Sequence, residues 1–319
     1  MKLKLRVEVR SKTVIQLPLV LVFGIAPLFA QWERDVRLTN DPALSATSYN
    51  NAWCVAAAGE LVHVVWYDNR IGAGNWEIYY KRSTDGGATW GIDTRLTNDD
   101  TTSSFPTVAA AGSNVHVVWQ DNRNGNSEIY YKRSTDNGTT WGTDMRLTSD
   151  TAYSNNPSLA ASGSYIHAVW EETRDGNTEI YYKRSTDNGT TWGTDTRLTD
   201  DASSSGLPSV AVSGSNVHTV WHDSRNGDLE IYYKRSTDNG ATWGADTCVT
   251  DVPYNSLWPC VAVSGSNVHI VWGDQRDIDI EIYYKRSTDN GATWDPDFRL
   301  TNAVGNSFYS SVAASGPLI

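Results

Sequence analysis

The sequence predicts an all-β fold, a β-propeller of four-stranded antiparallel blades. The main observation is a repeat in which the pattern S-T-D-x-G-x-T-W occurs five times, with its tryptophans always 51 residues apart. In addition, each repeat is rich in aromatic and β-branched residues and is punctuated by Gly, Asn and Asp. A period of this length with a β-type composition is typical of propellers and other β-repeat architectures.

The repeat from Pro106 to Asp150 divides into four strand-like runs. The second of them, Val115–Trp119, is almost wholly apolar, which indicates a strand buried on both faces. A polar loop with Gly125 as its turn residue precedes the third run. Four short strands in chain order make one blade, and we expect them at Thr107–Ala111, Val115–Trp119, Glu128–Arg133 and Asp144–Thr148.

Counting the repeats predicts five complete blades, at about 51–98, 106–149, 157–200, 208–251 and 259–302. Residues 33–40 have the sequence of a fourth strand, and residues 309–315 have that of a first strand. These two orphan strands indicate an incomplete sixth blade. Because unpaired strand edges template association, we expect either edge-to-edge self-association or completion by a missing C-terminal segment.

Residues 1–30 have the pattern of a secretory signal peptide. A basic start is followed by an apolar run from Val14 to Ala30 that contains Pro18 and Pro27. The alternative is an uncleaved anchor helix. We therefore expect residues 31–319 to form the propeller, without a membrane span after signal removal, and the protein to be secreted, periplasmic or at the cell surface.

Charge and cysteine content exclude several classes of function. The formal net charge of −11 at pH 7 becomes more negative without the basic leader, which disfavours nucleic acid and anionic membranes as partners. The cysteines are odd in number and lack CxxC spacing, so neither a zinc site nor a disulfide framework is expected. Cys54 and Cys260 occupy equivalent positions and could meet only if their blades were neighbours, and Cys248 has no such counterpart.

The repeated turn has a clear mechanical basis. Ser134 and Asp136 can accept hydrogen bonds from backbone N–H groups of the turn, and Gly138 permits a positive φ. This motif resembles the Asp-box, or bacterial neuraminidase repeat, of the sialidase superfamily. The resemblance implies a structural role on the blade periphery, away from the catalytic funnel, for these residues: Ser83, Asp85, Gly87, Trp90, Ser134, Asp136, Gly138, Trp141, Ser185, Asp187, Gly189, Trp192, Ser236, Asp238, Gly240, Trp243, Ser287, Asp289, Gly291 and Trp294.

A second resemblance overlaps the first. The stretch from Asp121 to Tyr131, together with R-L-T-S-D at Arg146–Asp150, is similar to repeats of the periplasmic propeller of the Tol-Pal system. That resemblance implies a protein-binding assembly scaffold.

Each repeat also carries one histidine in its second strand: His63, His116, His167, His218 and His269. Equivalent atoms of neighbouring blades are about 10 Å apart, whereas zinc ligands converge within about 2.1 Å of the ion. We therefore expect core packing, with no metal site and no cofactor. His222 is extra, and we expect it to be a solvated loop residue.

The W-x-D-x-R loop between the second and third strands holds the ligand-face candidates. An arginine surface could bind carboxylates bidentately. Alternatively, each acid braces the arginine two residues later within its own blade. The candidates are Asp68, Arg70, Asp121, Arg123, Glu172, Arg174, Asp223, Arg225, Asp274 and Arg276.

The sialidase resemblance implies an arginine triad, a Tyr–Glu nucleophile pair and an Asp general acid, each contributed once, and an R-I-P motif that this chain lacks. Departures from the repeat are few, namely the Ile71–Trp76 insertion, Glu171-Glu172, His222 and Asp277-Ile278-Asp279. No catalytic residue is therefore assigned. We expect an exported, non-enzymatic module that binds glycans or proteins, the alternatives being a sialidase-like exo-glycoside hydrolase and an assembly scaffold.

Overall fold

The computed structural model describes residues 35–48, 54–72, 74–302 and 304–315. The chain separates into a unit up to Leu38 and a compact unit from Thr39 onward, and the second unit holds all the strands of the described residues. All regular elements in these residues are β-strands, so the predicted class is confirmed. The described part of the chain has no helix that could span a membrane. The expected signal peptide at 1–30 lies outside it.

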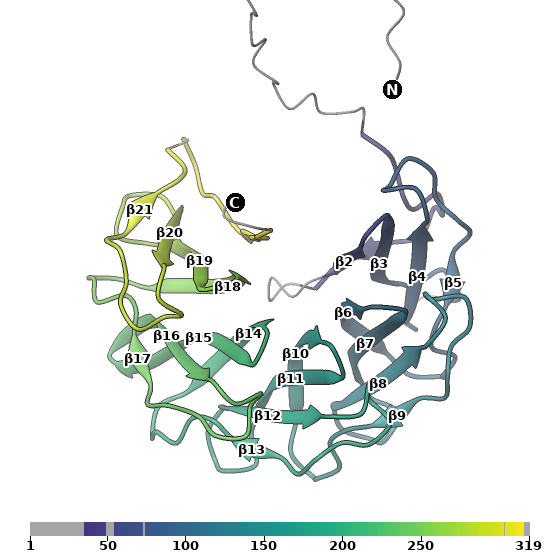
Figure 1. Cartoon of the computed structure of the whole chain (residues 1–319), viewed down its shortest axis with the longest axis horizontal. Helices are drawn as coiled ribbons and strands as arrows, with labels where there is room; N and C mark the ends of the chain where they lie inside the picture. The colour runs from purple at the N-terminus through teal and green to yellow at the C-terminus, as the bar shows by residue number, and fades with distance from the viewer. Residues whose placement is uncertain (1–34, 49–53, 73, 303, 316–319) are drawn as a thin grey trace, which may run out of the picture. The chain divides into compact units, whose positions relative to one another are not determined.

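Five antiparallel sheets follow one another along the chain, and we number them as blades 1 to 5 (Figure 1). Blade 1 consists of β1 (Ser45–Ala46), β2 (Val55–Ala58), β3 (Leu61–Asp68), β4 (Glu77–Ser83) and β5 (Thr94–Arg95). Blade 2 consists of β6 (Ser103–Ala111), β7 (Asn114–Asp121), β8 (Glu128–Ser134) and β9 (Met145–Arg146). Blade 3 consists of β10 (Ser154–Ser162), β11 (Tyr165–Glu172), β12 (Glu179–Ser185) and β13 (Thr196–Arg197).

Blade 4 consists of β14 (Ser205–Ser213), β15 (Asn216–Asn226), β16 (Asp228–Ser236) and β17 (Thr247–Cys248). Blade 5 consists of β18 (Ser256–Ser264), β19 (Asn267–Asp274), β20 (Glu281–Ser287) and β21 (Phe298–Arg299). In blades 2 to 5 the strands pair in chain order, as predicted.

The first strand of each blade begins earlier than predicted because a β-bulge lengthens it. In blade 2 the pairing of β6 with β7 shifts register between Ser104 and Thr107. Phe105 has a φ of 52°, and Pro106 after it has no N–H to donate to the ladder. The same bulge precedes Pro157, Pro208 and Pro259. In blade 1, β1 and β2 share this role, so the first blade starts at Ser45 rather than near residue 51.

Apolar side chains of successive blades pack against each other. Between blades 2 and 3, Val118 and Ile129 meet Leu159, Ile166 and Trp170, all at most 2% exposed. Equivalent clusters join blades 1 and 2, blades 3 and 4, and blades 4 and 5. The second strand is buried on both faces, as predicted: Val115, Val117, Val118 and Trp119 are all 0% exposed.

The Asp-box turn is closed by its own side chains. The backbone N–H of Gly138 donates to Ser134 Oγ at 2.8 Å, and that of Thr140 donates to Asp136 Oδ1 at 2.8 Å. Hydrogen bonds from Thr140 and Ser134 hold the pKa of Asp136 well below its usual range. The turn thus has the internal structure that its sequence predicts.

The same turn also holds the preceding blade. Trp192 of blade 3 packs edge-on against Tyr131 of blade 2, with ring centroids 5.1 Å apart. Tyr131 Oη bonds His116 Nδ1 at 2.7 Å, and Arg133 Nη1 donates to the carbonyl oxygen of Asn188 at 2.6 Å. We call this set of contacts the clamp. It recurs with Tyr80 and Trp141, Tyr182 and Trp243, and Tyr233 and Trp294. The indoles are only half-buried, because they cover the outer edge of the interface.

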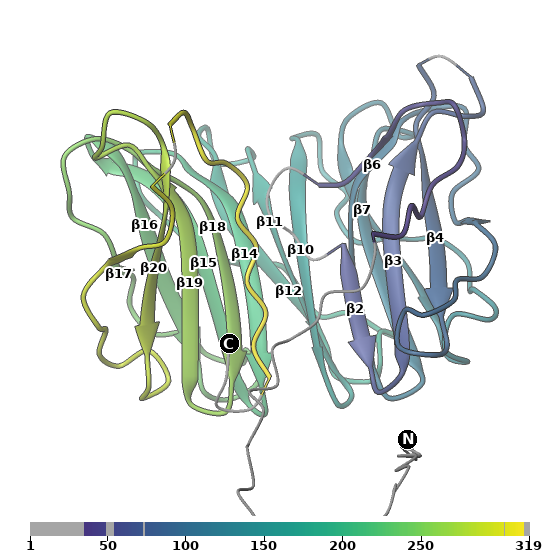
Figure 2. The same ribbon diagram turned by 90° about the horizontal axis from the view of Figure 1, so that it is seen from above.

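The two predicted orphan strands have no sheet of their own. Neither residues 35–40 nor residues 304–314 are assigned to a strand, because a first and a fourth strand cannot pair without the two between them. Even so, Val312 is only 8% exposed, and it packs with Cys260 and Ala262 of blade 5. Figure 2 shows this C-terminal segment running along β18. None of the three cysteines forms a disulfide within the described residues.

The clamp predicts unequal effects of one substitution in two blades. A Cβ on Gly189 would overlap Tyr131 Oη, whereas a Cβ on Gly87 would meet only Trp90, at 3.8 Å. Both glycines have positive φ, which costs alanine about 1–2 kcal/mol. We expect Gly189→Ala to lower the melting temperature much more than the control Gly87→Ala. Equal decreases in the two variants would contradict the clamp.

The buried histidines predict loss of stability in mild acid. Burial, aided by the charge of Arg133, lowers the pKa of His116 from 6.5 to about 3, and burial lowers that of His63 to about 4. Below pH 6.5 the unfolded chain takes up protons that these rings do not, so their contribution is complete above pH 6.5 and is lost as the pH falls towards 4. Scanning calorimetry should show a melting temperature that falls over this range, with a shallower slope for His116→Gln. An unchanged slope in that variant would contradict the assignment.

Candidate functional site

The sheets present two different ends. At one end, the loops between second and third strands meet the connections between blades, as in the bond from the N–H of Asn122 to the carbonyl of Thr102 at 3.1 Å. We call this end the loop face. At the other end, the Asp-box turns meet the turns between first and second strands, as in the bond from the N–H of Asn137 to the carbonyl of Ser113 at 2.8 Å.

The predicted acid–arginine pairs lie on the loop face, where each one forms a brace within its own blade. In blade 2, Asp121 is completely buried and accepts hydrogen bonds from Arg123 Nε at 2.8 Å and Nη2 at 2.6 Å. Its second oxygen also accepts from Trp119 Nε1 at 2.7 Å and from Ser103 Oγ at 2.9 Å. Burial raises the pKa of Asp121, but the bonds from Arg123 and Trp119 bring it below its ordinary value.

The guanidinium is held on its other sides as well. Arg123 Nη1 donates to Asp144 at 2.8 Å, Lys132 bridges the same carboxylate at 2.7 Å, and the guanidinium lies 4.5 Å above the centre of the Tyr130 ring. Every charged group of the brace therefore has a partner within one blade. The arrangement recurs with Asp68 and Arg70, Asp223 and Arg225, and Asp274 and Arg276.

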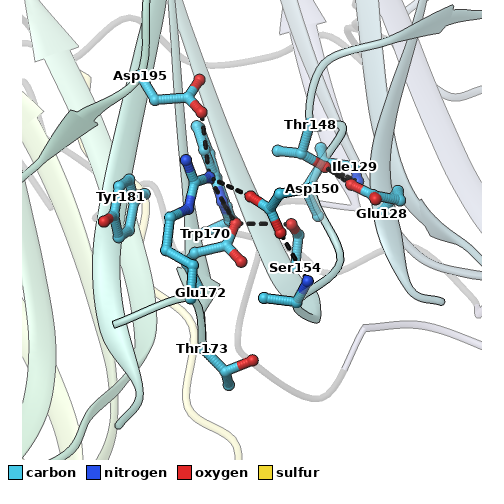
Figure 3. Close-up of polar contacts among 12 residues, drawn as sticks. Glu128, Ile129, Thr148, Asp150, Ser154, Trp170, Glu172, Thr173, Tyr181 and Asp195 are labelled. Carbon is cyan, nitrogen blue, oxygen red and sulfur yellow. Dashed lines mark hydrogen bonds and ion pairs between the residues drawn. The ribbon is translucent and has the colours of Figure 1, made fainter. Parts of the chain in front are cut away.

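The brace of blade 3 differs because a glutamate replaces the aspartate (Figure 3). Glu172 Oε2 accepts from Ser154 Oγ at 2.8 Å, Trp170 Nε1 at 3.1 Å and Arg174 Nη2 at 2.9 Å. Among the described residues, Glu172 Oε1 is buried and has no hydrogen-bond partner. The longer side chain also shifts the guanidinium, so that Arg174 Nη2 lies 3.0 Å from Asp150 and 3.1 Å from Asp195.

Next to the braces lies a row of positions that differ from blade to blade. The residue before each brace acid is Tyr67, Gln120, Glu171, His222 and Gly273 in turn. Beside these residues lie the bulge residues Phe105, Asn156, Leu207 and Trp258, all with positive φ between 50° and 54°. We call these two sets the variable row. Backbone strain of this kind is often found at binding sites.

Glu171 and His222 are the ionisable members of the variable row. Glu171 Oε1 accepts from the backbone N–H of Leu207 at 2.5 Å, and Oε2 accepts from Asn156 Nδ2 at 3.0 Å. A Cβ on Gly206 would lie 3.2 Å from Glu171 Oε1 and 2.8 Å from His222 Nε2. The carboxyl group and the imidazole therefore flank Gly206 at the junction of blades 3 and 4.

Burial controls the charge of both groups. It raises the pKa of Glu171 and lowers that of His222 to about 4. His222 Nδ1 is buried without a hydrogen-bond partner among the described residues. The prediction that His222 is a solvated loop residue is wrong, because the residue lies within β15 and faces the blade interface.

The described residues also form two hollows, one of which includes a candidate residue. A pocket of about 570 Å³ on the loop face of blade 5 is lined by Tyr254, Arg276 and the departure Asp277-Ile278-Asp279. A smaller cavity, about 170 Å³, is lined by alanines and valines of the first strands, among them Ala56, Ala109, Ala160 and Ala211. In the part of the chain that the structure describes, no three His, Cys, Asp or Glu side chains are grouped as metal ligands.

The exceptional brace of blade 3 leads to a prediction of increased stability. Glu172→Asp gives blade 3 the acid that the four other blades have, and it removes the buried oxygen without a donor. Because an unsatisfied buried acceptor costs about 1–3 kcal/mol, we expect the unfolding free energy to rise by about 1 kcal/mol. Urea denaturation would measure it, with Asp121→Glu as the opposite change. A less stable Glu172→Asp variant would show that Glu172 fits its site better than the contacts indicate.

Comparisons with known proteins agree with this architecture. Residues 108–317 match the family model described as "BNR repeat-like domain", which is more than half of the chain. A sialidase of Paraclostridium sordellii is 25% identical, over 52% of this chain and 49% of the relative. The chain thus spans about half the length of that curated relative.

Solved structures show the same fold at low sequence identity. The phage phi92 endosialidase aligns with a TM-score of 0.58 at 9% identity, over 86% of this chain and 62% of its own. An alpha-L-arabinofuranosidase of Fusarium graminearum has a TM-score of 0.58 at 15% identity, over 84% and 87%. The Trypanosoma rangeli sialidase has a TM-score of 0.57 at 15% identity, over 84% and 51%. With the Asp-boxes and the four-stranded blades, these matches show that the chain belongs to the BNR repeat-like family of sialidase-type propellers.

Proposed function

We propose that this protein is an exported, non-enzymatic propeller that binds a neutral glycan on its loop face, at the junction of blades 3 and 4. The observation that carries the proposal is the variable row. Clamps and braces recur from blade to blade, whereas the residues of the variable row change in every blade. A ligand-specific surface in a repeat protein has to use the positions at which the repeats differ.

The chemistry of this junction suits hydroxyl groups. Glu171 and His222 offer hydrogen-bond acceptors and donors on either side of Gly206, and Asn156 donates to Glu171. Sugar hydroxyl groups both donate and accept hydrogen bonds, so these groups complement them. Trp258, at the equivalent bulge of blade 5, packs instead against Phe308 and Tyr309.

Electrostatics favour a neutral rather than an acidic sugar. Every arginine in the described residues has a polar or charged partner, so recruiting one to an anionic sugar would break an existing contact. The net charge of −11 also repels anions.

A second candidate function is glycoside hydrolysis, because Glu171 has the raised pKa that a general acid needs. Glycosidases use two carboxyl groups on either side of one bond. Glu171 and Glu172 are adjacent in β11, so they point to opposite faces of the sheet. Glu172 is moreover engaged in the brace. This arrangement favours binding over hydrolysis.

The binding proposal predicts a specific loss of affinity. The double variant Glu171→Gln/His222→Gln places at both positions the residue that blade 2 already has, Gln120. We expect a glycan array and titration calorimetry to detect neutral glycans with the parent protein, and the double variant to bind them at least tenfold more weakly at a similar melting temperature. Unchanged affinity in the double variant would exclude this junction as the site.

An activity assay separates the two candidate functions. Fluorogenic sialosides and arabinofuranosides should not be hydrolysed above the level of a heat-treated control. Hydrolysis that disappears in Glu171→Gln would support the glycosidase instead.

A further inference from the structure

Each blade has a buried glutamate near the start of its third strand, and in four blades this glutamate pairs with an arginine of the fourth strand. In blade 2, Thr148 donates to Glu128 Oε2 (Figure 3), and Arg146 Nη2 donates to Glu128 Oε1 at 2.5 Å. The arginine is held a second time, because its Nε donates to the carbonyl oxygen of Thr148 at 2.7 Å. The equivalent pairs are Arg95 with Glu77, Arg197 with Glu179, and Arg299 with Glu281.

Blade 4 keeps the glutamate but has no arginine to pair with it. Cys248 stands where the other blades have arginine, and its thiol donates to the carbonyl oxygen of Thr250 at 2.7 Å. Glu230 is only 3% exposed, and it accepts hydrogen bonds from Thr250 Oγ1 and from the backbone N–H of Val252. Among the described residues, no ion pair involves Glu230. Blade 4 therefore buries a carboxyl group without a cation, which is rare in proteins.

The pKa of this carboxyl group reflects the missing cation. Burial raises the pKa of Glu230, and the negative charge of Asp251 raises it further. In blade 5, by contrast, hydrogen bonds from Thr301 and Arg299 hold the pKa of Glu281 below its ordinary value. The same position thus favours the ionised form where a guanidinium is present and disfavours it where none is.

A second donor to the glutamate is also lost in blade 4. In blades 2 and 3, Asn126 and Asn177 each donate to the glutamate two residues later, at 3.0 Å. The equivalent residue of blade 4 is Asp228, which is exposed and has no donor when it is ionised. Blade 4 has therefore replaced two donors without replacing the acceptor.

The acceptors of the arginine, by contrast, are complete in blade 4. In blade 3, Arg197 Nη2 lies 2.8 Å from Glu179 and 3.0 Å from Asp200. Glu230 and Asp251 occupy the equivalent positions in blade 4. Four copies of this site in one chain hold a guanidinium, and the fifth has the same carboxyl groups without it.

From this comparison we propose that blade 4 binds a guanidinium group supplied from outside the chain, either an arginine side chain of a partner protein or free arginine. One of its N–H groups donates to Glu230 and another donates to Asp251. The ligand can enter from solvent, because Cys248, Asp228 and Asp251 are all exposed. The site shares no residue with the proposed glycan site, so either could exist without the other.

The geometry favours a guanidinium over an ammonium group. A guanidinium is planar and presents several N–H donors at once, so it can bond two carboxyl groups together. An ammonium group is more strongly hydrated, and its transfer to a buried carboxyl group costs more. The arginine side chains of the other four blades are 27–34% exposed, so a guanidinium at this position lies close to the surface.

The probe is N-acetyl-L-arginine amide, and N-acetyl-L-lysine amide is the control of equal charge. Titration calorimetry with the full chain should show one saturable site for the arginine probe and at least tenfold weaker binding of the lysine probe. Glu230→Gln and Cys248→Arg should each weaken binding at least tenfold, the second because its own guanidinium fills the site. Cys248→Ser should bind the probe as the parent does, because a small side chain leaves the space open.

Blade 3 allows the matched gain of a site. Arg197→Cys removes the guanidinium from Glu179 and Asp200, so it should raise the number of bound probes from one to two. The double variant Arg197→Cys/Cys248→Arg should bind one probe again. A folded Arg197→Cys variant that still binds a single probe would contradict the role of the unpaired glutamate.

Two further ligands distinguish the sources of the guanidinium. A Gly-Arg-Gly peptide with blocked ends that binds at least as tightly as the probe identifies an arginine of a protein, whereas at least tenfold tighter binding of free L-arginine identifies the amino acid. Absence of saturable binding of all three to the parent, or affinity that Cys248→Arg leaves unchanged, would overturn the inference. Zinc binding that Cys248→Ser abolishes, in a parent that does not bind the probe, would also overturn it in favour of a metal site.

Discussion

The contact between a third-strand tyrosine and the Asp-box of the following blade is the constraint on which the rest of the structure depends. Tyr131 can lie against Gly189 only because glycine has no side chain, and its hydroxyl group bonds His116 at the same time. The histidine, the tyrosine, the glycine and the tryptophan therefore belong to one interface. This shared contact spans two successive blades, so we expect substitutions of its members to be coupled.

A second constraint, the brace, explains how such a regular molecule can still present a specific surface. It uses the repeated arginines to hold the loop face, so in the proposed function they are not the ligand contacts. The residue just before each brace acid belongs to the variable row. Because the brace fixes the backbone at that point, neighbouring blades present different side chains from equivalent, well-held positions. Preorganisation of this kind lowers the entropic cost of binding.

The fold could be predicted because period, turn chemistry and buried strands all indicate the same architecture. The bulge at Phe105 could not be predicted, because it depends on how Pro106 interrupts the hydrogen-bond ladder with β7. The sequence could not decide whether Asp121 and Arg123 face a ligand or brace each other, because a spacing of two residues in a loop does not determine the direction of the side chains. The proximity of Glu171 and His222 requires both strand register and blade order. The signal available in the sequence was that the residue before the brace acid changes in every repeat.

The repeats also provide an internal standard for judging which departures matter. Blade 3 has two adjacent residues that are less favourable than their equivalents: Glu171 is a half-buried carboxyl group with a raised pKa where blade 2 has Gln120, and Glu172 leaves a buried oxygen without a donor among the described residues. Either could be replaced by the residue of another blade without altering the fold. Costs to stability that alternatives within the same chain would avoid are typical of functional sites. Both residues are consecutive in β11, and they lie beside the bulge at Asn156, which has a positive φ. The loop-face end of blade 3 is therefore the strongest candidate for ligand recognition.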